Sequence, residues 1–472
     1  MQPSAIVVGS GPNGLAAAIA LAQGGLSVEV REAAPVVGGA ARSGELTLPG
    51  FTHDLGSAVH PMALSSPFFS KLPLAEHGLK WIWQDAELAH PLDDGTAVML
   101  ERSVPATAAQ FGRDSGAYRK LFEPLVAEWP ALAEEVLGPL RWPRHPFLLA
   151  RFGWHALQPY TMLARSLFEG ERARALLAGP CAHSTLRLEA PIISGFGLTL
   201  TAAGHAAGWP IPAGGSQQIA EALTSVLRSL GGRIVTGARV ASLAETQTAD
   251  VTLCDVTPRQ FLKLAEGRLP ASYRQSLERY RYGPGVFKMD WALREPIPWR
   301  AKDCLRAATV HLGGTLAEIA ASERAVWRGK VSERPFVLLV QPSLFDQTRA
   351  PDGQHTAWAY CHVPNGWVGS AAEKIEAQVE RFAPGFRECI LARAAHGPAE
   401  MQAWDENLVG GDINGGDAAM MQFALRPTWR RYATPLKGVY LCSSSTPPGG
   451  AVHGMCGYWA AKWALDWLQK KR

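Results

Sequence analysis

The chain has 472 residues, enough for two or three domains, because single hydrophobic cores stop growing near about 250–300 residues. Hydrophobic residues make up 47% and charged residues 19%, which excludes a disordered chain. The net charge of +4 is small and no basic run exceeds the terminal QKKR, so we expect no nucleic-acid partner. Seven cysteines without CxxC or zinc-type spacing favour reduced, mostly buried thiols, a cytoplasmic protein and no metal site.

A βαβ pattern in residues 5–32 predicts a nucleotide site. The apolar strand AIVV is followed at once by Gly9-x-Gly11-x-x-Gly14, then by an Ala-rich helix and a second strand that ends in Glu32. Gly9 makes the tight turn, Gly11 lets a pyrophosphate approach the backbone, and Gly14 lets helix and strand pack closely. The helix N-terminus then faces the diphosphate, and the carboxylate of Glu32 can accept both hydroxyls of an adenosine ribose.

A second glycine pair favours FAD over NAD as the nucleotide. Gly38 stands six residues after Glu32, and Gly39 and Arg42 follow it. The two glycines let another backbone segment meet the same diphosphate, and Arg42 can help to neutralise it. Two loops on one pyrophosphate favour FAD.

With GFTHDLGSAVHPM after Glu32-x5-Gly38-Gly39, the chain resembles the phytoene desaturase-like proteins, which include carotenoid desaturases, carotenoid isomerases and retinol saturases. Amine oxidases are more distant relatives. The resemblance returns at residues 208–265 and 405–472, and it implies a discontinuous FAD-binding domain made of these blocks and residues 1–70. The further cofactor contacts that it implies are Pro12, Asn13, Ala58, Val59, Val240, Ser444, Gly450, Val452 and His453.

The chain departs from this family at its last glycine-rich loop. Members often carry Gly-x-Gly-Thr-His-Pro-Gly, whereas this chain has serine at 443–445 before Thr446 and Pro447. Serine hydroxyls are therefore expected to replace the usual contacts to the ribityl chain. His453 is expected to contribute its backbone amide rather than its imidazole.

The rest of the chain predicts an α+β substrate domain from residues 71–207 and 266–404. Inserted into a Rossmann-like FAD-binding domain, it completes an α/β fold. Residues 112–207 are rich in Leu, Ala, Trp and Phe with Pro breaks, which predicts a helical cap. VFKMDWAL predicts a strand, and FVLLVQPSLFDQTRAPDGQHTAWAYCHVP predicts a hairpin, both in a mixed sheet. One face of the hairpin either walls a substrate channel or belongs to ordinary core; it carries Trp358, Tyr360 and His362.

The uncharged segment from Ala190 to Ala213 is predicted to line the path of an apolar substrate. Its Pro and Gly breaks argue against a membrane span, although peripheral contact with a membrane is compatible with it. We expect Phe196 and Leu198 to face the channel.

Candidate proton-handling groups are few. His60 can move a proton as an imidazole near its neutral pKa, or it makes a structural hydrogen bond. Lys288 resembles the strand lysine of amine oxidases, which orders a water near the flavin, but an ion pair with Asp290 on the same strand face is the simpler interpretation. Asp412 and Asn414, among four glycines, predict backbone hydrogen bonds in a tight loop.

The sequence thus predicts an FAD-dependent oxidoreductase that transfers a hydride to or from C–C or C=C bonds of an apolar, polyene- or lipid-like small molecule. One dinucleotide fingerprint is present, so oxygen, a quinone or a protein is expected as the electron acceptor. Two alternatives remain: a flavin amine or amino-acid oxidase, and a flavin-free prenyl- or lipid-binding chaperone of the same fold. The strand that starts at Ala5 predicts that no signal peptide is present.

Overall fold

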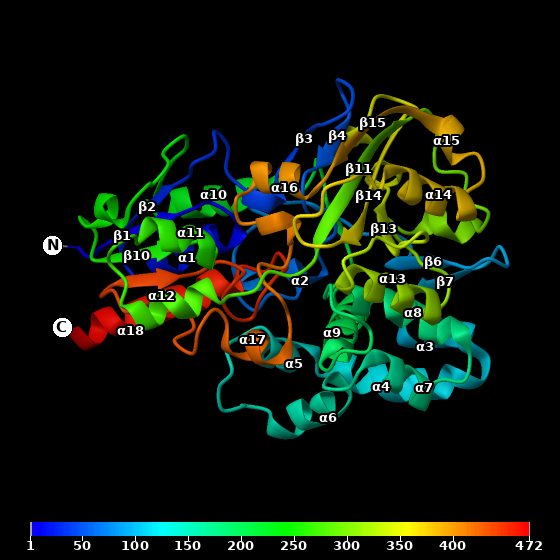
Figure 1. Ribbon diagram of the computed structural model, residues 1–472, viewed down its shortest axis with the longest axis horizontal. Helices are drawn as coiled ribbons and strands as arrows, with labels where there is room; N and C mark the ends of the chain where they lie inside the picture. The colour runs from blue at the N-terminus through cyan, green and yellow to red at the C-terminus, as the bar shows by residue number, and fades with distance from the viewer. Residues whose placement is uncertain (1, 472) are drawn as a thin grey trace.

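The computed structural model describes residues 2–471, which fold around two main β-sheets and a group of helices beside the second sheet (Figure 1). Residues 1 and 472, at the ends of the predicted segments 1–70 and 405–472, lie outside the described residues. The first strand and the last helix lie at the same end of the molecule.

The first sheet is parallel and has the order β16-β10-β1-β2-β9. Its strands are β1 (Ser4–Val8), β2 (Ser27–Arg31), β9 (Arg233–Val235), β10 (Val251–Cys254) and β16 (Val439–Leu441). They come from three separated parts of the chain. The central strand β1 is almost entirely apolar and buried because helices cover both faces of a parallel sheet. This arrangement confirms the Rossmann-like part of the predicted α/β fold.

Helices pack on both faces of this sheet. On one face α1 (Pro12–Gln23) packs between α10 (Gln217–Ser229) and α18 (Met455–Lys471). On the other face lie α11 (Pro258–Leu264) and α12 (Ala271–Glu278), whose apolar side chains join those of β1 in one cluster. In Figure 1 the carboxyl end of β1 points into the molecule, toward the second sheet.

The second sheet is mixed and has the order β15-β11-β14-β13-β12-β6-β7. Its strands are β6 (Leu88–Pro91), β7 (Ala97–Leu100), β11 (Gly285–Leu293), β12 (Thr309–Leu312), β13 (Val337–Val340), β14 (His355–Val363) and β15 (Ile390–His396). Neighbours are antiparallel except β12 and β6, which confirms both the mixed sheet and the predicted hairpin. One face packs on α14 (Ala372–Phe382), and the other faces a large cavity.

Helices fill the predicted cap region. They are α3 (Val104–Ala108), α4 (Ser115–Ala127), α5 (Trp129–Val136), α6 (Pro146–Ala156), α7 (Tyr160–Leu167), α8 (Glu171–Ala182) and α9 (Ile193–Ala206). Helix α9 is central, since it packs on α4, α6 and α8. It ends before Gly208, whose φ of 94° is left-handed, and Pro210 follows. Within residues 2–471, no helix is both long and apolar enough to cross a membrane.

Short elements complete the fold. They are β3 (Ser43–Glu45), β4 (Thr52–Asp54), β5 (Trp81–Ile82), β8 (Ile211–Pro212), α2 (Pro61–Leu64), α13 (Leu316–Trp327), α15 (Phe386–Cys389), α16 (Pro398–Trp404) and α17 (Met420–Leu425). All seven cysteines are buried and free, as the sequence predicts.

Candidate active site

The glycine turn after β1 can form only with glycine at its ends. Gly9 has a φ of 99°, which side-chain-bearing residues rarely adopt. A Cβ atom on Gly14 would lie 2.2 Å from the carbonyl oxygen of Gly9, so helix α1 and strand β1 meet backbone to backbone. The first turn of α1 consequently opens toward the cavity, where Pro12 and Asn13 form part of the wall.

The second glycine loop lies directly on the first. The amide of Gly38 donates a hydrogen bond to the carbonyl of Ser10 (3.1 Å), and a Cβ atom on Gly39 would lie 3.1 Å from the Cα of Gly11. The guanidinium of Arg42 fastens this loop by donating to the carbonyls of Gly39 (2.8 Å) and Trp404 (2.5 Å). The two loops thus form one surface, while a role of Arg42 toward a diphosphate stays a prediction.

The carboxylate of Glu32 is fixed at the end of β2. It accepts hydrogen bonds from the amide (2.8 Å) and the hydroxyl (2.6 Å) of Ser10 and from the amide of Ala34 (2.8 Å). Its carboxylate is therefore held beside the glycine turn, as a ribose site requires. Val240 is buried with Ile6 in the apolar cluster on the other side of β1, and its predicted contact with adenine stays a prediction.

Asp255 is a residue that the sequence analysis missed. It follows β10, and its Oδ2 atom accepts a hydrogen bond from the amide of Gly14 (2.8 Å) at the start of α1. Burial raises the pKa of this carboxyl to about 7, although the hydrogen bond from Gly14 lowers it. The signal was an acid placed directly after an apolar strand, because the carboxyl ends of parallel strands share one edge of the sheet.

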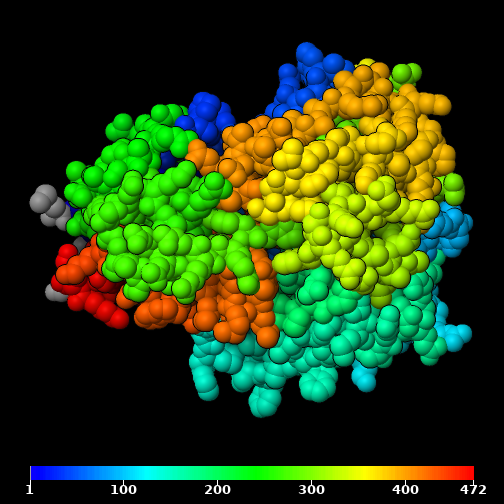
Figure 2. All heavy atoms as spheres, in the orientation of Figure 1, coloured from blue at the N-terminus to red at the C-terminus, as the bar shows by residue number. Residues whose placement is uncertain are grey.

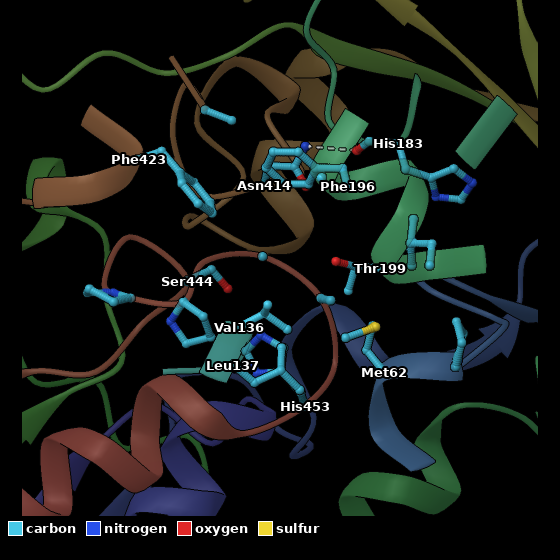
Figure 3. Close-up of a pocket in the computed structure, with 18 of the residues that line it drawn as sticks. Met62, Val136, Leu137, His183, Phe196, Thr199, Asn414, Phe423, Ser444 and His453 are labelled. Atoms are coloured by element: carbon cyan, nitrogen blue, oxygen red, sulfur yellow. Dashed lines mark hydrogen bonds between the residues drawn. The ribbon is translucent and has the colours of Figure 1, made fainter. Parts of the chain in front are cut away.

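A cavity of about 1420 Å³ runs from the glycine turn to α6. In Figure 3, Ser444 and His453, from the loop after β16, lie across it from Phe196 and Asn414. The cavity brings together ten of the predicted site residues: Pro12, Asn13, Ala58, Val59, His60, Lys288, Ser444, Gly450, Val452 and His453. The remaining predicted residues, in the two glycine loops and at Glu32, Arg42 and Val240, do not line the cavity.

Several buried polar atoms of this wall have no hydrogen-bond partner within residues 2–471. They are Asn13 Oδ1, Ser57 Oγ, His60 Nδ1, Arg141 Nε, Trp358 Nε1 and Arg426 Nε. Such atoms are rare in folded proteins because each costs free energy unless a ligand or water satisfies it. They lie around the cavity next to the two glycine loops, so the residues present fit a dinucleotide with polar ring and phosphate groups.

The hydrogen bonds of His60 define its tautomer. Its Nε2 lies 2.8 Å from the hydroxyl of Ser216, and that hydroxyl donates its single proton to the carbonyl of Ser57 (2.5 Å). Ser216 must therefore accept from Nε2–H, which leaves the lone pair on Nδ1. Burial lowers the pKa of His60 to about 4, so the ring is neutral at pH 7. His60 thus combines the predicted structural hydrogen bond with a free proton acceptor at the cavity wall.

Lys288 and Asp290 form the ion pair that the sequence favours. Both lie on the cavity side of β11, and the ammonium of Lys288 also sits 5.4 Å from the ring centroid of Trp358. Burial lowers the pKa of Lys288, whereas the charge of Asp290 raises it. Burial likewise raises the pKa of Asp290 to about 6, against the opposing effect of Lys288. A catalytic role for Lys288 stays a prediction.

The loop that contains Asp412 makes the backbone bonds predicted for it. Its carboxylate accepts from the amides of Gly283 (2.8 Å) and Asn414 (2.7 Å). The amide of the Asn414 side chain donates to the carbonyl of His183 (3.2 Å), which joins this loop to the end of α8 (Figure 3). The imidazole of His453 accepts from the amide of Met455 (3.0 Å) at the start of α18.

The structure places only part of the predicted channel wall on the cavity, and the expectation for Leu198 is wrong. Trp358 and Tyr360 line the cavity, whereas His362, on the same face of β14, does not line it and has its Nδ1 2.7 Å from Glu323 of α13. Phe196 lines the cavity, but Leu198 is 3% exposed and packs in the interior of the cap. Two residues along a helix differ by about 200° in direction, so the two side chains point to opposite sides of α9.

Comparisons with known proteins agree with this fold. Residues 7–70 match the family model of the NAD(P)-binding Rossmann-like domain. The chain is 28% identical to mouse pyridine nucleotide-disulfide oxidoreductase domain-containing protein 2, over 97% of this chain and 92% of that protein. The match spans almost the whole chain and includes both the glycine loops and the cap.

Solved structures share the whole architecture. An oxidoreductase from Methanosarcina mazei is 17% identical with a TM-score of 0.65, covering 98% of this chain and 100% of that one. Wild-type putrescine oxidase bound to putrescine is 19% identical with a TM-score of 0.61, covering 99% of each chain. The comparisons support an oxidoreductase with a Rossmann-like dinucleotide domain and confirm the α/β fold class, whereas FAD as the cofactor and the narrower resemblance to phytoene desaturase-like proteins stay predictions.

Proposed function

We propose that this protein is an FAD-dependent oxidoreductase that transfers a hydride to or from a C–C or C=C bond of a long, apolar, polyene- or lipid-like substrate. The observation that carries the proposal is the lining of the cavity. Apart from neutral histidines, its ionisable groups are mostly cationic: Arg141, Lys288 and Arg426, with Glu135 as the single carboxylate among the described lining residues. Apolar side chains form most of the remaining wall, which suits an apolar substrate rather than a charged one.

FAD is supported by the two glycine loops that meet at Ser10 and by the fixed carboxylate of Glu32. Both loops and the cavity wall supply the amides and unpaired polar atoms that a dinucleotide needs. Bound FAD would supply the two-electron chemistry: in the oxidative direction it takes a hydride from one carbon, the adjacent carbon loses a proton, and dioxygen or a quinone accepts the electrons.

The protein's own residues would orient the substrate and manage the proton. Trp358, Tyr360 and Phe196 make apolar walls that exclude water from the reacting carbons. The free Nδ1 of His60 can hold a proton at the wall, and its Nε2–H stays bound to Ser216. The pKa of His60, about 4, makes the ring a transient carrier rather than a permanent cation.

An amine oxidase is the second candidate, because putrescine oxidase shares the fold. An ammonium substrate would need a carboxylate in the cavity to offset its charge. Glu135 already accepts from the amides of Arg144 (2.7 Å) and His145 (2.9 Å), and the carboxylate of Asp290 is already paired with Lys288 (2.5 Å). The geometry therefore favours the apolar substrate. The intact glycine loops likewise argue against a flavin-free lipid chaperone.

Anaerobic bleaching of the protein-bound flavin tests the proposal. Purified holoprotein is mixed with matched concentrations of polyenes, long-chain lipids, and mono- and diamines, and the flavin absorbance is followed. We expect a polyene or lipid to bleach the flavin faster than any amine. Bleaching led by an amine would establish the oxidase alternative, and protein that stays colourless after incubation with FAD would refute the flavoenzyme itself.

A further inference from the structure

Exposed apolar side chains gather in one region of the surface. Of seventeen large hydrophobic residues that are exposed among the described residues, ten lie in two segments, 140–162 and 420–429. They are Leu140, Trp142, Phe147, Trp154, Leu157, Met162, Met420, Met421, Leu425 and Trp429. We call this set the apolar rim. In Figure 2 the teal segment that includes α6 forms the lower edge of the molecule and carries projecting side chains, next to the orange segment that includes α17.

The apolar rim surrounds the outer opening of the cavity. Five of its members also line the cavity although at least half of each is exposed to solvent: Leu140, Trp154, Leu157, Met162 and Met420. A residue can do both only where the cavity meets the surface. The same cavity reaches the glycine turn at its other end, so the rim marks the entrance to the candidate active site.

Helix α6 is apolar on both of its faces. Leu148, Phe152 and Ala156 recur at helical spacing and are buried against the rest of the cap. Phe147 and Trp154, seven residues apart, occupy the opposite face and project into solvent. A helix that is hydrophobic all round needs a second apolar environment on its outer face.

Arginine is concentrated in the two segments of the rim. Residues 136–168 contain four arginines and no aspartate or glutamate, and residues 418–465 contain three arginines and two lysines, again without an acid. Arg144 pairs with Glu134 of α5 (3.3 Å), and Arg151 pairs with Glu128, which directly precedes α5 (2.7 Å). Within residues 2–471, no carboxylate lies within salt-bridge distance of three other arginines of these segments, Arg165, Arg430 and Arg431.

We propose that the apolar rim docks on the surface of an anionic lipid bilayer, with Trp142, Phe147 and Trp154 inserted among the lipids and the arginines beside the head groups. Aromatic side chains flanked by arginine are the composition that interfacial helices use. A second copy of the chain fits less well, because two such rims would bring like charges together. The consequence for catalysis rests on the proposed function: an apolar substrate would pass from the bilayer through the rim into the cavity.

Vesicle co-sedimentation of the full-length holoprotein tests the surface directly. We expect at least tenfold tighter binding to phosphatidylglycerol/phosphatidylcholine vesicles than to phosphatidylcholine alone, at low ionic strength. The double variant Trp142→Asp/Phe147→Asp changes side chains that are 93% and 91% exposed and do not line the cavity, and it should lose at least tenfold in binding. Val368→Asp is the matched control, since Val368 is also 93% exposed but lies between β14 and α14, away from the rim.

Two results would overturn the proposal. One is wild-type protein that stays in the supernatant with both kinds of vesicle. If light scattering then shows a dimer that the double variant dissociates, a second copy of the chain covers the rim instead of a bilayer. The other is an equal loss of binding in Val368→Asp. Bleaching of the flavin by a detergent-dispersed substrate tests the proposed function separately from membrane docking. Vesicle binding without bleaching by any polyene or lipid would support docking of the apolar rim and refute the proposed reaction.

Discussion

The ammonium of Lys288 lies 2.5 Å from each carboxylate oxygen of Asp290, and both side chains are at most 1% exposed. The pair stands in the cavity face of β11, with His53 3.5 Å and His396 3.8 Å from the same carboxylate. A buried charge pair depends on both partners, because either charge alone would be buried without compensation. The stability of the second sheet therefore depends on this ion pair at the cavity face of β11.

Lys288→Met should lower the free energy of unfolding by about 3–5 kcal/mol at pH 8. The loss should shrink toward pH 5, because burial already raises the pKa of Asp290 to about 6 and removal of the ammonium raises it further. Below that pKa the carboxyl is protonated and no bare charge is buried. Urea unfolding of the variant at both pH values measures the difference.

Two controls accompany this variant. Lys374→Met removes an exposed pair with Glu333 and should cost less than about 1 kcal/mol. Lys288→Met/Asp290→Asn removes both buried charges and should recover part of the lost stability. A single variant as stable as wild type at pH 8 would contradict the account of the pair.

Gly11→Glu should abolish FAD binding. A Cβ atom at position 11 would lie 2.9 Å from Oδ2 of Asp255, and the new carboxylate would stand in the turn that is predicted to hold the diphosphate. Gly116→Glu is the control, because Gly116 is exposed in α4 and has open space around it. The FAD released by heat from each purified protein is quantified. Equal FAD content in both variants would refute this site.

Asp255→Asn should flatten the dependence of stability on pH. A carboxyl whose pKa is raised from its ordinary value to about 7 contributes stability that is full below about pH 4 and lost as the pH rises through 7. The asparagine cannot ionise, yet its Oδ1 can still accept from the amide of Gly14. We therefore expect the free energy of unfolding of the variant, minus that of wild type, to be more positive at pH 8 than at pH 5. Urea unfolding of both proteins at both pH values measures this difference.

The matched control at this position is Asp255→Leu. It removes the acceptor for Gly14 as well as the charge, so it should destabilise the protein at both pH values. If Asp255→Asn lost as much stability at pH 8 as Asp255→Leu, ionised Asp255 would be a stabilising group and the argument from burial would be wrong.

NADPH should reduce the bound flavin slowly. In residues 2–471, the unit of strand, GxGxxG and helix occurs once, at β1 and α1, and the carboxylate of Glu32 there would repel a 2′-phosphate. The glycine pair between β12 and α13, Gly313-Gly314, leads into a capping box at Thr315 instead. Stopped-flow reduction at a rate on the order of ten per second would contradict the single site.

The sequence predicted those parts of the site that are local. The turn from Gly9 to Gly14, the acid after β2 and the hairpin of β13 and β14 each follow from residues close together in the chain. Asp255 was missed because its contact with Gly14 spans 241 residues and exists only once β10 pairs with β1. Arg426, whose guanidinium donates to the carbonyl of Ser444, was also missed.

The sequence also did not predict the rotation of α9 about its axis, for a different reason. Its sequence, ISGFGLTLTAAGHA, is apolar all round, so its pattern does not indicate which side faces the cavity. Packing against α8 and α6 decides the question in the structure. The expectation that Leu198 faces the channel failed for this reason, although the same segment does line the cavity through Phe196.

This difference gives a prediction that separates substrate contact from packing. Phe196 lines the cavity, half-buried and edge-on to Phe423 with ring centroids 5.3 Å apart, so Phe196→Asp places a carboxylate in the substrate path. We expect this variant to keep its FAD and most of its stability while bleaching by an apolar substrate falls at least tenfold. Leu198→Asp instead buries a carboxylate in the cap, at a cost of several kcal/mol. It should appear as a lowered melting temperature and poor yield. Equal bleaching rates in Phe196→Asp and wild type, with stability intact, would show that the substrate does not pass α9.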